Sequence, residues 1–240
     1  MQVTPRRKQS PALLWYTMCA MWLGIYLTIT LRSDARGHVA PLSRILLLLL
    51  AALCAYLGAR LPRMGETIPC DMRARRVRRA MWLCFALYLH LVLTFTLFDP
   101  AMGRDFHSFW HATAADRVQY MRHHINFTPL HTIRTVYLDG YRNGFISRAD
   151  LLLNLAGNLL VFTPFAFFVP YLLCGGYPAL RFALLTLAVI LSVELCQLVL
   201  MCGICDIDDV ILNFSGAAAA YLLLSLPPLR RLTARAFLTA

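Results

Sequence analysis

Six apolar stretches restrict the folds that this chain can adopt. They cover approximately residues 12–32, 42–60, 80–98, 151–173, 179–201 and 210–226. Because a helix rises about 1.5 Å per residue, each stretch can cross, or nearly cross, roughly 30 Å of hydrocarbon. With 59% hydrophobic and only 15% charged residues, the composition excludes an ordinary soluble domain. The sequence predicts an all-α, polytopic membrane helix bundle with about six transmembrane helices.

Clusters of basic residues predict the orientation of the bundle. Five arginines lie in residues 73–79, just before the third apolar stretch. Loops rich in arginine are retained in the cytoplasm, and this choice also places the basic residues at 6–8 and 230–235 inside. We expect cytoplasmic N- and C-termini in a plasma membrane. The net charge of +11 then reflects orientation, not nucleic-acid binding.

The chain is expected to have three parts. Residues 1–79 form two transmembrane helices and a basic cytoplasmic linker, residues 80–226 form the main membrane domain, and residues 227–240 form a cytoplasmic tail. The first apolar stretch exceeds the roughly 7–15 residues of a signal-peptide core, so we expect it to stay as an anchor.

The predicted external loop, residues 99–150, contains a pattern of its own. Apolar side chains recur at helical spacing at Ala114, Val118, Met121 and Ile125. This spacing predicts an amphipathic helix on the outer surface, which could also serve as a lid. A solvated connector with a single helical turn is the alternative.

Five polar residues interrupt the last three apolar stretches. They are Asn154, Asn158, Glu194, Gln197 and Asn213. A rise of about 1.5 Å per residue places them roughly 6–12 Å below the predicted outer surface. Asn154 and Asn158 share one helix face, and Glu194 and Gln197 share another. Ionisable groups in a membrane are costly and often functional, so we expect these faces to meet in a polar pocket in the outer half of the bilayer. The alternative is a hydrogen-bond network that only fixes helix packing.

An acidic turn with Asp206, Asp208 and Asp209 lies above this pocket. We expect either Asp208 or Asp209 to cap the sixth helix. Asp206 and the other carboxylate are then available for a divalent cation, a basic substrate group or an arginine of the external loop. The spacing does not match a full calcium-binding loop, and we predict neither a bound metal nor a cofactor.

Histidine and cysteine pairs leave two interpretations open. His107 and His111 have the spacing of metal ligands, but the surrounding aromatic residues favour an interfacial segment. Cys202 and Cys205 form a C-x-x-C motif that is either a disulfide or redox pair, or two idle thiols. His90, within the third stretch, is either a packed residue or a proton relay.

Three sequence blocks resemble the VanZ-like family of bacterial membrane proteins, whose founding member confers resistance to the glycopeptide antibiotic teicoplanin. The blocks are Asn126-Phe127-Thr128-Pro129-Leu130 with Thr132-Ile133; Asn154-Leu155-Ala156-Gly157-Asn158 with Phe162 and Pro164-Phe165; and Glu194-Leu195-Cys196-Gln197 with Asp206-Ile207-Asp208-Asp209 and Asn213. The likeness covers roughly residues 80–226. One departure is Cys202 and Cys205, where relatives often carry Arg or Phe.

The resemblance adds the external segment of residues 126–133 to the predicted pocket. It implies that Pro129 stiffens this segment and that Asn126 reaches the pocket from above. The leading hypothesis is a non-enzymatic membrane protein that engages an envelope lipid, a lipid-linked precursor or a glycopeptide and contributes to teicoplanin-type resistance. The alternatives are a membrane enzyme acting on lipid head groups, a proton-coupled transporter and a scaffold for partner proteins. No catalytic residue is assigned.

Overall fold

The computed structural model describes residues 11–36, 41–61, 69–99, 104 and 107–237. Six helical segments in this part are long and apolar enough to cross a membrane: Ala12–Thr30, Ser43–Arg60, Cys70–Phe98, Arg148–Leu172, Ala179–Val199 and Ile207–Ser225. The predicted all-α bundle with six spans is confirmed. The cytoplasmic location of the termini stays a prediction.

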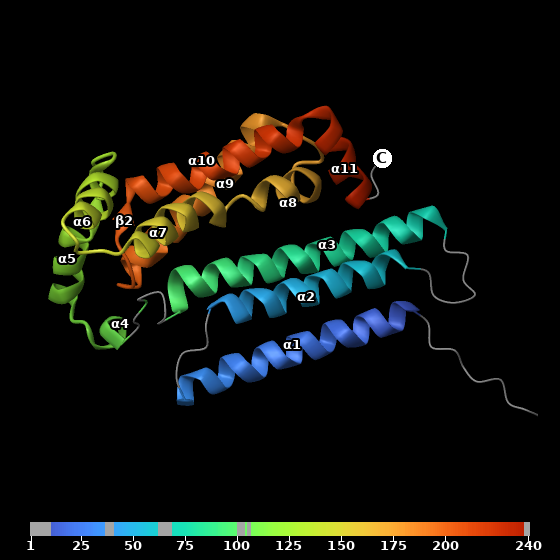
Figure 1. The fold of residues 1–240 in the computed structure, drawn as a ribbon, viewed down its shortest axis with the longest axis horizontal. Helices are drawn as coiled ribbons and strands as arrows, with labels where there is room; N and C mark the ends of the chain where they lie inside the picture. Colours follow the sequence, from blue (N-terminus) through green and yellow to red (C-terminus); the bar gives the residue numbers. More distant parts are fainter. Residues whose placement is uncertain (1–10, 37–40, 62–68, 100–103, 105–106, 238–240) are drawn as a thin grey trace, which may run out of the picture. The chain divides into compact units, whose positions relative to one another are not determined.

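The chain forms two compact units, which are described separately. The first comprises Met1–Leu91 and Ala234–Ala240, and the second comprises Val92–Thr233. The first unit contains α1 (Pro11–Arg36), α2 (Pro41–Arg60) and most of α3 (Cys70–Leu93) (Figure 1). Small side chains lie where α1 and α2 meet, namely Cys19, Ala51, Cys54 and Ala55. A Cβ on Gly58 would lie 3.1 Å from Cε1 of Tyr16, so glycine allows this close approach.

The third span begins earlier than predicted. Helix α3 starts at Cys70, so residues 70–79 of the predicted linker are helical. Arginine is a good helix former. Asp71 in the first turn also forms an ion pair with Arg75, with 2.7 Å between Oδ2 and Nη2. Hydropathy predicts where a helix enters hydrocarbon but not where the helix begins. Farther along α3, Nε2 of His90 lies 2.8 Å from the hydroxyl of Tyr26, which favours the packed role for this histidine.

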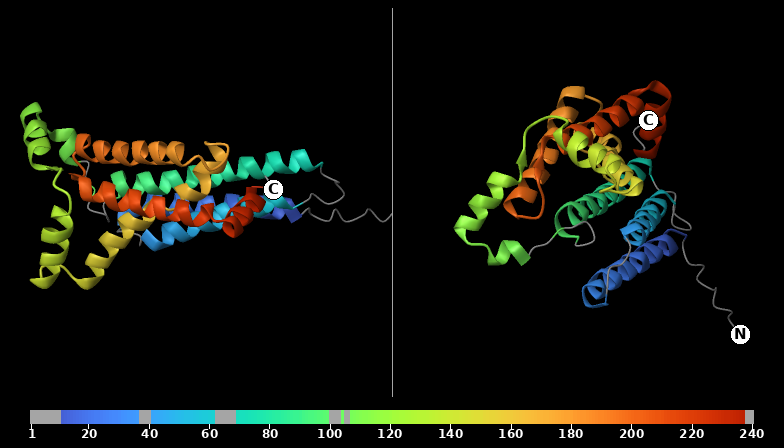
Figure 2. Two further views of the ribbon diagram at one scale, coloured as in Figure 1. Left: turned by 90° about the horizontal axis from the view of Figure 1, so that it is seen from above. Right: turned by 60° about the vertical axis from the view of Figure 1, so that its left-hand side comes forward.

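The second unit contains the remaining elements, most of which are visible in two further orientations in Figure 2. They are η1 (Thr94–Phe98), α4 (His107–His111), α5 (Ala114–His123), β1 (Ile125–Asn126), η3 (Ile133–Leu138), α6 (Asp139–Arg142), α7 (Arg148–Val161), α8 (Phe165–Leu172), α9 (Ala179–Val199), β2 (Cys205–Asp206), α10 (Ile207–Ser225) and, up to Thr233, α11 (Pro227–Phe237). The predicted tail is thus helical over most of its length. The fourth span is divided between α7 and α8 because Pro164 has no N–H for a continuous helix.

The described part of the predicted external loop, here called the external segment, folds into several short helices. One of them, α5, covers most of the predicted amphipathic helix. Helices α5 and α6 run crosswise to α9 and α10 at one end of the unit (Figure 1). Helix α5 begins with a capping box in which the side chains of Thr113 and Asp116 each accept the other's backbone N–H. None of its residues is buried, and Val118 and Met121 are 47% and 37% exposed. The predicted apolar stripe is therefore available to lipid or to a partner. The side chain of His107 lies outside the described residues.

Helices α7 and α10 approach each other most closely at Gly216. A Cβ placed on Gly216 would overlap the backbone carbonyl oxygen of Leu159. Backbone cannot move away as a flexible side chain can, so glycine is required at this crossing. This contact brings the polar residues of α7 next to the first turn of α10.

We predict that Gly216→Ala destabilises the second unit by about 1–3 kcal/mol, the range for overpacking a tight contact. Gly157→Ala is the matched control, because a Cβ on Gly157 of α7 meets nothing within 4 Å. Thermal unfolding of both purified variants in the same detergent measures the effect. Equal melting temperatures for the two variants would contradict this account of the α7–α10 contact.

Candidate functional site

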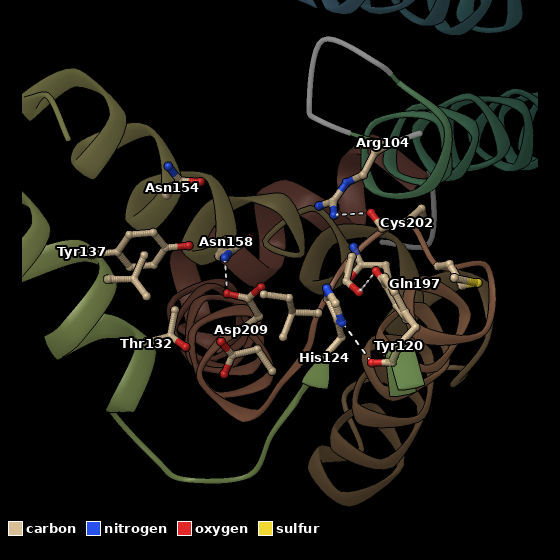
Figure 3. A pocket seen from close by; sticks show the side chains of 15 residues that line it. Arg104, Tyr120, His124, Thr132, Tyr137, Asn154, Asn158, Gln197, Cys202 and Asp209 are labelled. Atoms are coloured by element: carbon tan, nitrogen blue, oxygen red, sulfur yellow. Dashed lines mark hydrogen bonds between the residues drawn. The ribbon is translucent and has the colours of Figure 1, made fainter. Parts of the chain in front are cut away.

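A polar cavity of about 510 Å³ lies among the external segment and one end of α7, α9 and α10 (Figure 3). Its lining residues are Arg104, Tyr120, His124, Thr132, Val136, Tyr137, Asn154, Asn158, Gln197, Met201, Cys202, Gly203, Ile204, Asp206 and Asp209. They come from segments far apart in the sequence. Five of the predicted site residues lie on this cavity, namely Asn154, Asn158, Gln197, Asp206 and Asp209.

Asp206 connects three of these segments. Strands β1 and β2 pair in parallel, with Asn126 opposite Asp206. The Asp206 side chain accepts hydrogen bonds from Nδ2 of Asn126 and from the backbone N–H of Asp208, each at 2.9 Å. Its own backbone N–H donates to the carboxylate of Glu194 at 3.2 Å. One residue thereby joins the external segment, α9 and the start of α10.

The cap of α10 differs from the prediction. Asp206 is the N-cap, and neither Asp208 nor Asp209 is. The backbone of Asp206 is still extended, which lets its side chain reach the free N–H of Asp208, whereas the next two acids already belong to the helix. The sequence showed three candidate acids but not the residue at which helical geometry begins.

Asp208 connects the external segment to the first turn of α10 by hydrogen bonds. It is fully buried and accepts backbone hydrogen bonds from Leu130 and Ile133. Leu130 has a φ of 63°, a left-handed conformation that is unfavourable for a residue with a side chain. Pro129 precedes it at the surface in a turn closed by a hydrogen bond from His131 to Thr128. Asp208 and Pro129 therefore shape the segment without lining the cavity.

Glu194, Asn126 and Asn213 also lie behind the cavity wall. Glu194 is 3% exposed and supports Asp206 from α9. Asn126 donates to Asp206 and, at 3.1 Å, to the hydroxyl of Thr132. Asn213 is buried in α10, and its side-chain oxygen has no hydrogen-bond partner within the described residues. Of the ten predicted site residues, these three together with Pro129 and Asp208 do not face the cavity.

The amides of α7 and α9 have different roles. Asn158 donates to the Asp209 carboxylate across the helix contact (Figure 3). Asn154 instead donates to the carbonyl of Asp150 within its own helix, at 2.8 Å. Gln197 donates to the carbonyl of Thr96 at 3.0 Å, in the π-helical turn η1 that ends the third span. Of these three amides, only Asn158 donates to an acid of the turn.

Arg104 provides a positive charge on the cavity. Its Nη1 donates to the carbonyl of Cys202 at 2.9 Å, and its Nε is buried without a hydrogen-bond partner in the described structure. A Cβ on Gly203 would lie 2.6 Å from that Nη1, so glycine allows the guanidinium to approach the loop. Within the described residues, Arg104 forms no ion pair with Asp206 or Asp209.

Tyrosines from the external segment complete the lining. Tyr120 donates to the carbonyl of Gly203 at 2.8 Å. Burial, together with the nearby carboxylates of Asp209 and Asp206, raises the pKa of Tyr137 to about 12. The Tyr137 hydroxyl therefore stays protonated at neutral pH and can donate a hydrogen bond to a ligand.

Arg104, Tyr120, His124 and Tyr137 line the cavity but were not identified from the sequence, whereas Thr132 lies in the segment 126–133 that the family resemblance added to the predicted pocket. They lie in the predicted external loop. Polar residues are common in loops, so their polarity does not show which of them line a cavity. An arginine from this loop was one of the expected partners of the acids, but the loop contains six and nothing in their spacing separates them.

The cavity is not arranged like a metal site. In the described part of the chain, no group of three or more His, Cys, Asp or Glu side chains could hold a metal ion. Cys202 and Cys205 are free thiols, the first buried and the second partly buried. Burial raises the pKa of both thiols, and the charge of Arg104 opposes this increase at Cys202.

We predict that alkylation of Cys202 accelerates as pH rises from about 7 to about 10, since only the thiolate reacts and its pKa is raised. Arg104→Gln removes the charge that opposes the increase in pKa and therefore moves the midpoint of this pH profile upward. Peptide mass spectrometry of alkylated protein gives the profile, with Arg122→Gln on α5 as the control. The comparison uses the midpoint of the pH profile and not the alkylation rate, because a more mobile loop would raise that rate at every pH. A lower midpoint in Arg104→Gln would contradict the placement of Arg104.

A model of the VanZ/LLP1 family matches residues 85–228 of the chain. The chain belongs to the VanZ/LLP1 family. The match includes every residue that lines the polar cavity, so the cavity lies wholly within the family's region of this chain. No curated protein and no solved structure matches the chain. For this VanZ/LLP1 protein, function must therefore be inferred from the cavity itself.

Proposed function

We propose that this VanZ/LLP1 protein is a non-enzymatic protein of the bacterial plasma membrane whose cavity engages the polar head of an envelope lipid or a cell-wall-related molecule. The supporting observation is a cavity that is large, polar and located at the end of membrane-spanning helices. A lipid-linked molecule could place its head group in this cavity while its chain stays in the bilayer. The domain responsible is residues 80–226, with the cavity facing the outer leaflet.

The charges on the cavity favour a ligand that carries an amine. Asp206 and Asp209 both line it, whereas Arg104 is the sole arginine among the lining residues. An ammonium group can approach the carboxylates, and a carboxylate or phosphate of the same ligand can approach Arg104. Asn154, which is exposed, and the protonated Tyr137 can donate hydrogen bonds to the uncharged parts.

The arrangement of Asp206 favours binding over catalysis. Its side chain caps α10 and accepts from Asn126, so transfer of a proton to it would weaken two structural hydrogen bonds. The Asp209 side chain accepts a hydrogen bond from Asn158 at the cavity and is better suited to meet a ligand. Family membership extends the proposal to a contribution to glycopeptide resistance of the teicoplanin type.

We predict that Asp209→Asn weakens ligand binding roughly tenfold, since a charged hydrogen bond contributes about 1.5–3 kcal/mol. A strain that depends on the protein should lose its protection against teicoplanin. Asp139→Asn is the control, because Asp139 is an exposed acid of α6 that pairs with Arg142 at 3.3 Å and lies outside the cavity. Susceptibility assays and lipid mass spectrometry of the complemented deletion strains measure both effects.

Unchanged susceptibility and an unchanged lipid profile in a normally inserted Asp209→Asn variant would contradict the proposal. Turnover of labelled envelope lipids by the purified protein would instead support the alternative of a head-group enzyme. Uptake into vesicles that depends on pH would support a transporter.

A further inference from the structure

His124 lines the polar cavity and uses only one of its two ring nitrogens for the fold. Its Nδ1 lies 2.9 Å from the backbone carbonyl oxygen of Tyr120. A carbonyl oxygen can only accept, so Nδ1 carries the hydrogen, and Nε2 of the uncharged ring is then an acceptor. Nε2 points away from that carbonyl (Figure 3). Within the described residues it has no hydrogen-bond partner, so it is available to a ligand.

The imidazole of His124 is held in one orientation. Its ring stacks on that of Tyr120, with 3.6 Å between the centroids and 6° between the planes. The hydroxyl of Tyr120 donates to the carbonyl of Gly203, and the backbone carbonyl of His124 accepts from the N–H of Cys205 at 2.9 Å. An acceptor that is fixed in advance loses little conformational entropy when it binds a donor. The position of Nε2 is therefore set before a ligand arrives.

The same backbone contact brings His124 next to the acidic turn. Cys205, which donates to the carbonyl of His124, directly precedes Asp206 in the sequence. His124, Asp206 and Asp209 all line the cavity, and Figure 3 labels His124 and Asp209 on it. The cavity thus combines two charged acceptors with one neutral acceptor.

These acceptors distinguish between amines of the same charge. A primary ammonium group carries three N–H groups, whereas a trimethylammonium group carries none. The carboxylate of Asp209 attracts both groups through charge, but Nε2 of His124 forms a hydrogen bond only with the first. A binding site built to accept a hydrogen bond disfavours a ligand that lacks the donor, because the acceptor is then left without a partner.

We propose that the ligand of the polar cavity carries a primary ammonium group, which donates one N–H to Nε2 of His124 and another to the carboxylate of Asp209. This inference rests on the function proposed above and adds the kind of amine that the cavity accepts. A phosphate of the same ligand then lies at Arg104. Phosphatidylethanolamine carries both groups, and phosphatidylcholine differs from it only in the three methyl groups on the amine.

Native mass spectrometry of the full-length protein with these two lipids, with matched acyl chains, tests the inference. The unmodified protein should retain phosphatidylethanolamine roughly tenfold better, the usual effect of a hydrogen bond to a charged group. His124→Phe keeps a flat ring next to Tyr120 but has no Nε2. Retention of phosphatidylethanolamine should therefore fall roughly tenfold in this variant, and that of phosphatidylcholine should not fall. His123→Phe is the matched control, because His123 is exposed and does not line the cavity.

N-methylated lipids provide a test that does not depend on the folding of a variant. Monomethyl and dimethyl phosphatidylethanolamine keep two N–H groups and one, respectively, so retention by the unmodified protein should fall from the first to the second. Equal retention of all four lipids would overturn the inference. Equal effects of His124→Phe and His123→Phe would overturn it as well.

Asp209→Asn separates failure of this inference from failure of the proposed function. If this variant retains less of both lipids while His124→Phe changes neither, the cavity attracts amines through charge alone and only the inference fails. If Asp209→Asn changes the retention of neither lipid, the proposed function fails together with the inference. A loss in both variants, confined in His124→Phe to phosphatidylethanolamine, supports the two proposals.

Discussion

The hydrogen bonds around Asp206 hold the second unit in its observed form. They connect Asn126 in the external segment, Glu194 in α9 and the first turn of α10 through one residue that is 3% exposed. Burying a polar group without a hydrogen-bond partner costs several kcal/mol. Each of these groups can be buried because the others provide its hydrogen-bond partners. These three segments form the cavity walls together with α7, and this network fixes the positions of the three relative to one another.

Helix geometry gives the other two acids of the turn, Asp208 and Asp209, different surroundings. Consecutive residues of a helix point about 100° apart, so Asp208 and Asp209 cannot face the same neighbour. Asp208 points to the external segment and accepts its backbone N–H groups, while Asp209 points to the cavity and to Asn158. Two carboxylates of the acidic turn, those of Asp206 and Asp208, therefore support the local structure, and Asp209 is the acid proposed to meet a ligand. This explains why so many acids occur within four positions.

Sequence patterns predicted the parts of this arrangement that depend on hydropathy and on helical spacing. Six spans and the shared location of Asn158, Gln197 and Asp209 follow from those two properties alone. The cap at Asp206, the β1–β2 pair and the approach of Arg104 could not be predicted, because they depend on where a helix begins and on which distant backbone lies opposite. The close contact of Gly216 with the carbonyl of Leu159 could not be predicted either, because it depends on how α7 and α10 cross.

The charges that line the polar cavity limit what it can bind. Carboxylates of Asp206 and Asp209 disfavour a phosphate in this cavity except beside Arg104. Under the proposed function, the ligand therefore carries a positive group that compensates for the two acids, as an amine on a modified lipid head or on a peptide-bearing precursor does.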